Sequence, residues 1–146
     1  MLNKLVKMTI GKLTKNGLKM PFFTSTIPAG FPSPAQDYQE EEIDLGKVLQ
    51  PNPNTTFVIR IKGNSMENAN MPDGCLAVVD RSIRPISGAI VVAVLDGEFT
   101  VKRLVQAGRN LVLHPENPFY KPILITEEMS FQVWGVITYT IVDQKL

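Results

Sequence analysis

Alternating hydrophobic and polar positions dominate the chain from residue 56 onward. In Thr56–Lys62, the apolar residues Phe57, Ile59 and Ile61 recur at every second position, which is typical of a half-buried strand. Five further segments, rich in β-branched and aromatic residues and separated by Gly, Pro or Asn, are Cys75–Asp80, Ala89–Leu95, Phe99–Val105, Leu111–His114 and Phe131–Val142. The pattern predicts at least six strands in a mostly β fold, a small, twisted, barrel-like antiparallel domain.

One pair of strands is predicted by its turn. The dipeptide Asp96-Gly97 separates the segments AIVVAVL and EFTVKRLV. Glycine readily adopts the positive φ that a type I′ turn requires, so these segments are expected to form an antiparallel hairpin. The chain contains no helix-turn-helix pattern and no internal repeat.

The residues before this β region have a different character. Pro21–Pro34 contains four prolines, which remove backbone donors and exclude a regular helix or a central strand. We therefore expect an extended N-terminal arm at 1–29, an extended linker segment at 30–55, and a β domain at 56–146.

Charge is distributed unevenly along the chain. Residues 1–36 contain five lysines and no acid, whereas the rest of the chain has 10 basic and 14 acidic residues, a net charge of −4. Widely spaced lysines without arginine are a weak phosphate-binding pattern, so a solvated tail is favoured over a nucleic-acid contact. We also hypothesise that the basic arm rests on the acidic cluster of Glu40, Glu41, Glu42 and Asp44.

Composition narrows the class of protein. A chain of 146 residues with 44% hydrophobic and 20% charged residues suits one globular domain. One cysteine, Cys75, and one histidine, His114, form neither an internal disulfide nor a structural zinc site, so we expect a reducing, cytoplasmic location and no metal or cofactor. The longest apolar run, Ala89–Leu95, has seven residues, far below the ~20 of a membrane span, and lysines interrupt the N-terminus.

Most known catalytic arrangements are missing from the sequence. His114 has no evident partners for a histidine-based triad, and no Walker loop, dinucleotide fingerprint or HExxH motif occurs. Cys75 is interpreted as a small buried hydrophobe, and the adjacent pair Glu127-Glu128 as solvated surface. A serine activated by a base other than histidine remains, and lysine is the known alternative.

The stretch GNSMENANMPDG, residues 63–74, places Ser65 in a polar turn between two predicted strands. Lys102 is on a strand where Thr100 shares its face. A lysine of pKa about 10.4 is neutral in roughly one molecule in 2,500 at pH 7, so a basic role requires burial that lowers its pKa by about three units, near 4 kcal/mol. A turn serine and a solvated lysine remain the simpler interpretation, and spacing alone does not decide between them.

A combination of several motifs favours one of these two interpretations. Four of them occur in the order Ala29-Gly30, GNSM from Gly63, PDG from Pro72, and DGEFTVK from Asp96 to Lys102. They are accompanied by GFPSPA from Gly30, Asp37-Tyr38 and Ile43-Asp44-Leu45. From about Ala29 to Val142 the chain resembles the self-cleaving S24 serine peptidases typified by LexA, phage repressors and UmuD, and most of all the UmuD-like members.

This resemblance implies a role for each matching residue. Ser65 would be the nucleophile, Lys102 the general base, and the backbone amides of Asn64 and Ser65 the oxyanion hole. The scissile bond would be Ala29–Gly30. The position of Asn64 is acidic in UmuD, which matters little because the role belongs to its backbone.

The resemblance also implies a biological setting. Self-cleavage would be stimulated by a RecA filament on single-stranded DNA, and the processed homodimer would serve a UmuC-type Y-family polymerase in translesion synthesis during the SOS response. No sequence-specific DNA binding is implied.

Three other functions are alternatives to a UmuD-like peptidase. A LexA-like regulator would need a DNA-binding domain, for which 29 N-terminal residues without a helix-turn-helix are too few. A signal peptidase with the same Ser-Lys chemistry would need a membrane anchor. A catalytically silent β-domain adaptor, with Ser65 as an ordinary turn residue, is the remaining competitor.

Overall fold

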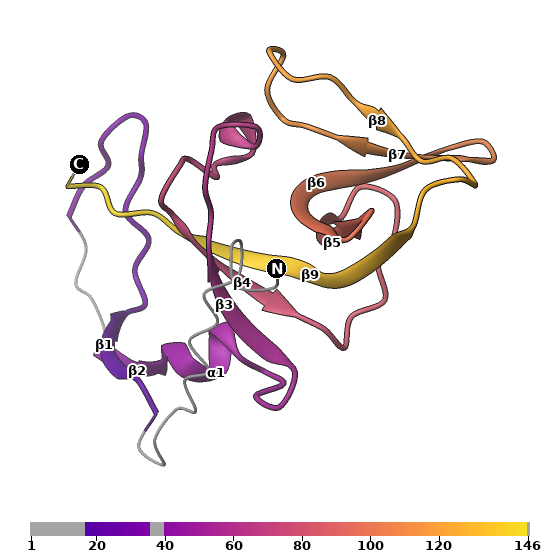
Figure 1. Ribbon diagram of the computed structural model, residues 1–146. Coiled ribbons are helices and arrows are strands. Elements are labelled where there is room, and N and C mark those ends of the chain that lie inside the picture. Colours follow the sequence, from indigo (N-terminus) through magenta and orange to yellow (C-terminus); the bar gives the residue numbers. More distant parts are fainter. Residues whose placement is uncertain (1–16, 36–39, 146) are drawn as a thin grey trace. The chain divides into compact units, whose positions relative to one another are not determined.

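The computed structural model describes residues 17–35 and 40–145 (Figure 1). Within these residues the chain divides into two compact units, residues 17–51 and residues 52–145, and each is considered by itself. Four of the five arm lysines, Lys4, Lys7, Lys12 and Lys15, and the acidic residue Asp37 lie outside the described residues.

The larger unit is built on one seven-stranded sheet. Its strands are β3 (Thr56–Arg60), β4 (Leu76–Asp80), β5 (Ile90–Leu95), β6 (Glu98–Ala107), β7 (Asn110–His114), β8 (Ile123–Leu124) and β9 (Phe131–Ile141). They are ordered β3-β4-β9-β5-β6-β7-β8, with every neighbouring pair antiparallel. Figure 1 shows β9 running through the middle of the sheet. In this described part of the chain the sheet is open, with β3 and β8 as its edges.

The mostly β, antiparallel fold expected from the sequence is confirmed. All six expected strands are present, as β3 to β7 and β9, with ends that differ by at most two residues from the expected ranges. The Asp96-Gly97 hairpin is also confirmed, because β5 pairs antiparallel with β6 and both turn residues have positive φ, 47° and 81°. The two-residue strand β8 was not expected, since two residues are too short to show alternation.

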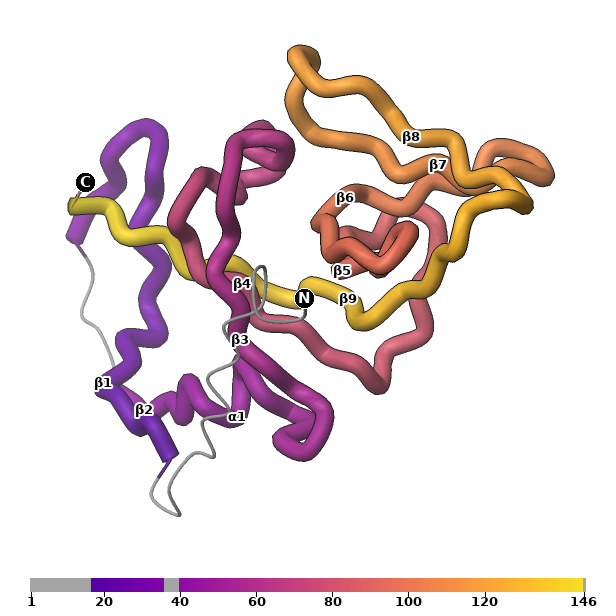
Figure 2. The backbone as a smooth tube through the Cα atoms, viewed as in Figure 1, coloured from indigo at the N-terminus to yellow at the C-terminus, as the bar shows by residue number. Residues whose placement is uncertain are grey.

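Two groups of buried side chains stabilise the larger unit. One contains Ile59, Trp134, Met66 and Met71, and the other contains Val91, Ala93, Leu104, Leu113 and Val136. Met66 and Met71 come from the excursion between β3 and β4, so this excursion is anchored in the core. Figure 2 shows it rising from the ends of β3 and β4.

A buried carboxylate, that of Asp80, lies at the C-terminal end of β4. Asp80, only 2% exposed, accepts hydrogen bonds from Asn52 Nδ2 at 2.9 Å, Thr55 Oγ1 at 2.9 Å, and the backbone and hydroxyl of Ser82 at 2.8 and 2.7 Å. Burial alone would raise the pKa of Asp80, but these hydrogen bonds outweigh it and lower the pKa to about 2.

We expect Asp80→Ala to lower the free energy of unfolding by about 1 to 3 kcal/mol at neutral pH, because four donors lose their acceptor. A lowered carboxyl pKa stabilises the fold above the ordinary value of 3.8, and this contribution is lost as the pH falls toward 2. Urea unfolding at about pH 7 and about pH 2 should therefore show a deficit that shrinks in acid. Glu98→Ala, at an exposed position on β6, is the control. A deficit of equal size in acid would contradict this account.

The smaller unit contains a two-stranded antiparallel sheet and a short helix. Strand β1 (Lys19–Phe23) pairs with β2 (Glu40–Asp44), with Lys19 opposite Asp44 and Phe23 opposite Glu40, and α1 spans Leu45–Leu49. A sheet of two strands has only edges, so it tolerates Pro21. Within the expected linker segment, 30–55, the structure thus has the strand β2 and one short helix, α1.

Part of the arm thus lies against the acidic cluster within this unit. Lys19 Nζ is 3.6 Å from Glu42 Oε1, and the Asp44 carboxylate accepts the backbone N–H of Leu18 at 3.2 Å. The Lys19–Glu42 ion pair is mostly solvent-exposed and contributes little by itself. The backbone ladder between β1 and β2, which the sequence did not predict, adds to the expected charge contact.

Candidate active site

The excursion from Gly63 to Gly74 is a closed loop with a defined base. Ile61 N–H donates to Cys75 O at 2.9 Å, and Gly74 N–H donates back to Ile61 O at 2.8 Å. Beyond this pair, Gly63 N–H donates to the Asp73 carboxylate at 2.6 Å. Gly63 and Gly74 have φ of 92° and 85°, a region that favours glycine. The glycines and Asp73 therefore bring the two ends of the excursion together.

The turn that carries Ser65 is fixed from behind. Met66 is 1% exposed, so the residue after the serine is locked in the core while Ser65 stays half-buried. Glu67 N–H donates to Asn64 O at 3.2 Å, and a short 3₁₀ helix, Glu67–Ala69, follows. The Ser65 hydroxyl consequently has a defined position.

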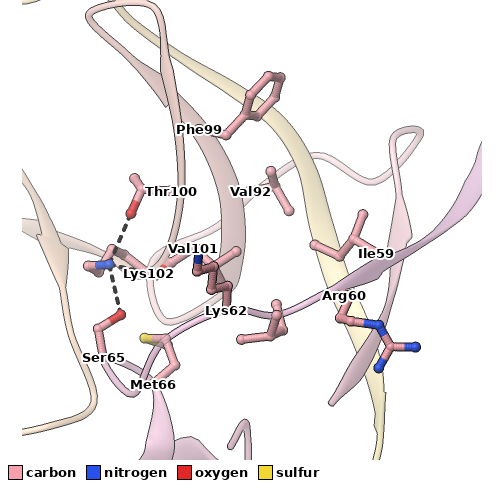
Figure 3. Close-up of a pocket in the computed structure, with 11 residues that line it drawn as sticks. Ile59, Arg60, Lys62, Ser65, Met66, Val92, Phe99, Thr100, Val101 and Lys102 are labelled. Carbon is pink, nitrogen blue, oxygen red and sulfur yellow. Dashed lines mark hydrogen bonds between the residues drawn. The ribbon is translucent and has the colours of Figure 1, made fainter. Parts of the chain in front are cut away.

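Strand β6 brings Lys102 to this hydroxyl. Lys102 Nζ lies 3.0 Å from Ser65 Oγ, 2.9 Å from Thr100 Oγ1 and 3.0 Å from Val101 O. Figure 3 shows the amine between the hydroxyls of Ser65 and Thr100, while the guanidinium of Arg60 points away from it. The strand alternation places Thr100 and Lys102 on one face, as the sequence indicated.

These three partners can accept the three N–H groups of an ammonium, and they also suit a neutral amine. Such an amine has two N–H donors and one lone pair. The carbonyl of Val101 only accepts, and the Thr100 hydroxyl can accept, so the two N–H groups are used there. In the neutral form the lone pair can face Ser65 Oγ, 3.0 Å away, and accept its hydroxyl proton. This geometry suits transfer of the proton from Ser65 to Lys102.

Burial favours the same protonation state. The half-buried side chain of Lys102 loses solvation, and this desolvation lowers its pKa below the ordinary value of 10.5. A cavity of about 80 Å³ adjoins the pair; it is lined by Ile59, Arg60, Ile61, Lys62, Ser65, Met66, Val92, Phe99, Thr100, Val101 and Lys102. None of these residues is acidic, so no carboxylate in the cavity lining stabilises the charged amine.

Comparison with known proteins places this chain in a family. The family profile described as Peptidase S24-like matches residues 21–138, a span that includes both Ser65 and Lys102. The chain belongs to the S24 peptidase family. The resemblance to UmuD-like S24 members expected from the sequence is thereby confirmed, and the serine peptidase class is established at the level of the family.

Curated relatives agree with this assignment. Protein SamA of Salmonella typhimurium is 49% identical over 118 residues, 81% of each chain. Protein ImpA of Salmonella typhimurium is 43% identical over 123 residues, 83% of this chain and 82% of the relative. Protein MucA of Escherichia coli is 38% identical over 127 residues, 87% of each. The similarity therefore extends over most of this S24 chain and of its relatives.

The other residues singled out in the sequence have different surroundings. Cys75 is buried, and desolvation raises the pKa of its thiol, so it remains protonated and unreactive. His114 is exposed at the end of β7, and Glu127 and Glu128 are exposed in a turn. The part of the chain that the structure describes contains no cluster of three or more His, Cys, Asp or Glu side chains suited to a metal ion. None of its helices has the length and apolar character needed to cross a bilayer.

Two predicted site residues belong to the smaller unit. Ala29 and Gly30 are exposed in the connection between β1 and β2, whereas Ser65, Lys102 and the Asn64 backbone are in the larger unit. Sequence reasoning gave no role to Thr100, although its place two residues before Lys102 on a strand was a usable signal. Asn117, which contacts the Ser65 turn, carried no local signal.

Proposed function

We propose that this chain is a UmuD-like self-cleaving peptidase in which Ser65 and Lys102 cut the Ala29–Gly30 bond. The observation that carries the proposal is the 3.0 Å distance between Lys102 Nζ and Ser65 Oγ. Desolvation of the half-buried Lys102 amine, which lowers its pKa, supports the same role. A nucleophile within hydrogen-bond reach of a base is the geometry that such catalysis requires.

The reaction proceeds in two steps. Ser65 Oγ attacks the carbonyl carbon of Ala29 as its proton passes to Lys102 Nζ, and the backbone amides of Asn64 and Ser65 bind the oxyanion. The C–N bond then breaks, and Lys102 returns the proton to the departing amine of Gly30. Water, deprotonated by Lys102, attacks the Ser65 ester. As the C–O bond to Ser65 Oγ breaks, Lys102 passes this proton to Ser65 Oγ, and the Ala29 acid loses its own proton to solvent. The serine and the lysine are regenerated in the same form.

Cleavage at this place would also free the arm. The Ala29–Gly30 bond lies in the connection between β1 and β2, so after cutting, β1 would be bound to β2 without a covalent link. A two-stranded sheet is marginally stable in water, and β1 should therefore dissociate. Its departure would expose the free edge of β2 with Glu40, Glu41 and Glu42 to a new partner.

Membership of the family supports a biological setting for this reaction. The residues before the cut would form the removable arm, 1–29, the segment 30–55 would link it to the peptidase domain, and 56–146 would be that domain. RecA filaments on single-stranded DNA would stimulate the cut. The processed homodimer would then act in the cytoplasm as the accessory subunit of a UmuC-type translesion polymerase. A β-domain adaptor without peptidase activity is the competing interpretation.

Incubation of the full chain at alkaline pH tests the proposal, because more of Lys102 is then neutral. Mass spectrometry should identify two products, 1–29 and a fragment that begins at Gly30, and gel filtration should separate them. Ser65→Ala should abolish both products, while Ser87→Ala, away from the cavity, should cut normally. An intact wild-type chain at every pH, and with RecA-coated DNA, would instead favour the adaptor. If the two products co-elute, the proposed release of the arm is wrong, whereas the proposed cleavage still holds.

A further inference from the structure

The loop between β7 and β8 contacts the turn that carries Ser65. Asn117 Nδ2 donates a hydrogen bond to Asn64 O at 2.8 Å. In the same loop, Glu116 O accepts the N–H of Asn68 at 2.9 Å, so the loop binds the turn on both sides of Ser65. Asn64 and Asn117 are 53 positions apart in the sequence, so it is the fold that brings them together.

The orientation of the Asn117 amide is determined by its second hydrogen bond. Asn117 Oδ1 accepts the backbone N–H of Phe119 at 3.0 Å, and the Asn117 carbonyl accepts the N–H of Tyr120 at 3.1 Å. A backbone N–H can only donate, so the oxygen of the side-chain amide must face Phe119 and its nitrogen must face Asn64. Aspartate at this position would have the same shape but would place an oxygen against the Asn64 carbonyl.

The hydrogen bond to Asn64 O acts on Ser65 through one peptide unit. The carbonyl of Asn64 and the N–H of Ser65 belong to the same planar trans peptide, so they point in opposite directions. Asn117 Nδ2 and the Glu67 N–H both donate to Asn64 O, and by fixing this carbonyl they aim the N–H of Ser65. A donor on the carbonyl also polarises the peptide and makes its N–H a stronger donor, because linked hydrogen bonds reinforce one another.

The loop is itself fixed to the strand that carries Lys102. Arg103, the next residue on β6, pairs with the Glu116 carboxylate through Nε and donates to Gly88 O at 2.6 Å. Both side chains of the pair are about one-third exposed or less. Strand β6 thus positions the base directly through Lys102, and the Ser65 peptide indirectly through Arg103, Glu116 and Asn117.

We infer that Asn117 is a positioning residue that aims the Ser65 N–H at the oxyanion formed during peptide-bond cleavage. The inference rests on the proposed function, because it assigns a task to the peptide that would form the oxyanion hole. Asn117 touches neither the substrate nor the reacting atoms, and it acts only through the 64–65 peptide.

The test compares self-cleavage in Asn117→Asp, Asn117→Ala and wild type across the alkaline range. Asn117→Asp should slow cleavage by about 100-fold, because it turns the peptide away from the reacting carbonyl. Asn117→Ala should slow it by about 10-fold, since water can replace the lost donor. The midpoint of the pH profile should stay unchanged in Asn117→Ala, because the three partners of Lys102 are untouched, whereas the new carboxylate of Asn117→Asp can raise it. Asn110→Asp, exposed at the start of β7, should cleave as wild type does.

A spectroscopic signature accompanies the rates. In ¹⁵N-labelled chain the Ser65 amide resonance should move in both Asn117 variants, while the side-chain resonances of Lys102 should stay in place in Asn117→Ala. A rate within about twofold of wild type for Asn117→Asp would overturn the inference, since misaimed donors cost far more. A displaced pH midpoint in Asn117→Ala, which adds no charge, would also overturn it, because Asn117 would then act through Lys102. If Asn117→Asp fails to fold, Asn117→Ala decides by the same criteria. Absence of cleavage in wild type would overturn the proposed function, and this inference with it.

Discussion

Lys102→Met is expected to lower the rate of self-cleavage by at least about 10³-fold without weakening the fold. Methionine keeps the length and apolar contacts of the lysine stem but has no lone pair to accept the Ser65 proton. Because burial of an amine disfavours its charged form, removing the amine should leave the free energy of unfolding unchanged or raise it. Loss of activity together with retained stability separates a base from a structural side chain.

The same substitution changes how stability depends on pH. The pKa of Lys102 is lowered in the folded chain, so between this pKa and the ordinary value of 10.5 the unfolded chain binds more protons. The wild type should therefore gain stability as the pH rises toward 10.5, and Lys102→Met should not show this gain. Lys121→Met, an exposed substitution outside the cavity, is the control. Self-cleavage by Lys102→Met at more than about a tenth of the wild-type rate would be incompatible with a basic role for Lys102.

Ala29→Phe is expected to slow cleavage by at least about 100-fold. For the bond to be cut, the carbonyl of Ala29 must reach Ser65 Oγ, and its side chain must fit next to the Ser65–Lys102 pair. The cavity there is small, about 80 Å³, so a benzyl group is expected to fit it less well than a methyl group. Analysis of the products at alkaline pH by mass spectrometry gives the rate.

Two control experiments test whether the effect of Ala29→Phe depends on the position of the substitution. Ala107→Phe adds the same side chain at the exposed end of β6 and should leave the rate unchanged. The Ala29→Phe chain keeps its own catalytic groups. If cleavage occurs between molecules, adding this chain to a Ser65→Ala chain should therefore cut the Ser65→Ala chain. Normal cutting of Ala29→Phe at the 29–30 bond would show that the side chain at 29 does not enter a narrow site.

The elements that the sequence predicted well are those with a strong local pattern. Period-two alternation located β3 to β7 and β9, and the positive φ favoured by Gly97 predicted the β5–β6 hairpin. Alternation also put Thr100 and Lys102 on one face of β6. The elements that were missed depend on contacts outside their own segment. Strand β2, with the sequence EEEID, has no alternation and forms a strand by pairing with β1.

The candidate site was predictable only in part for the same reason. Ser65 and Lys102 could be named from motifs that resemble a family, but burial and the third partner, Val101 O, required the fold. The hydrogen bond from Asn117 to Asn64 joins two loops of different hairpins, and neither loop has a local pattern that indicates the other. Long-range hydrogen bonds of single side chains leave no periodicity in a sequence, so only the structure reveals them.

The most direct test of the central claim is the titration of the Lys102 amine in the folded chain. Chains with ¹³C-labelled lysine report the charge of each amine through its Cε resonance, and the midpoint for Lys102 can be compared with the midpoint of the self-cleavage rate. The account predicts that the two midpoints coincide and lie below the ordinary value of 10.5. A Lys102 amine that titrates at or above 10.5, while cleavage proceeds at lower pH, would contradict it.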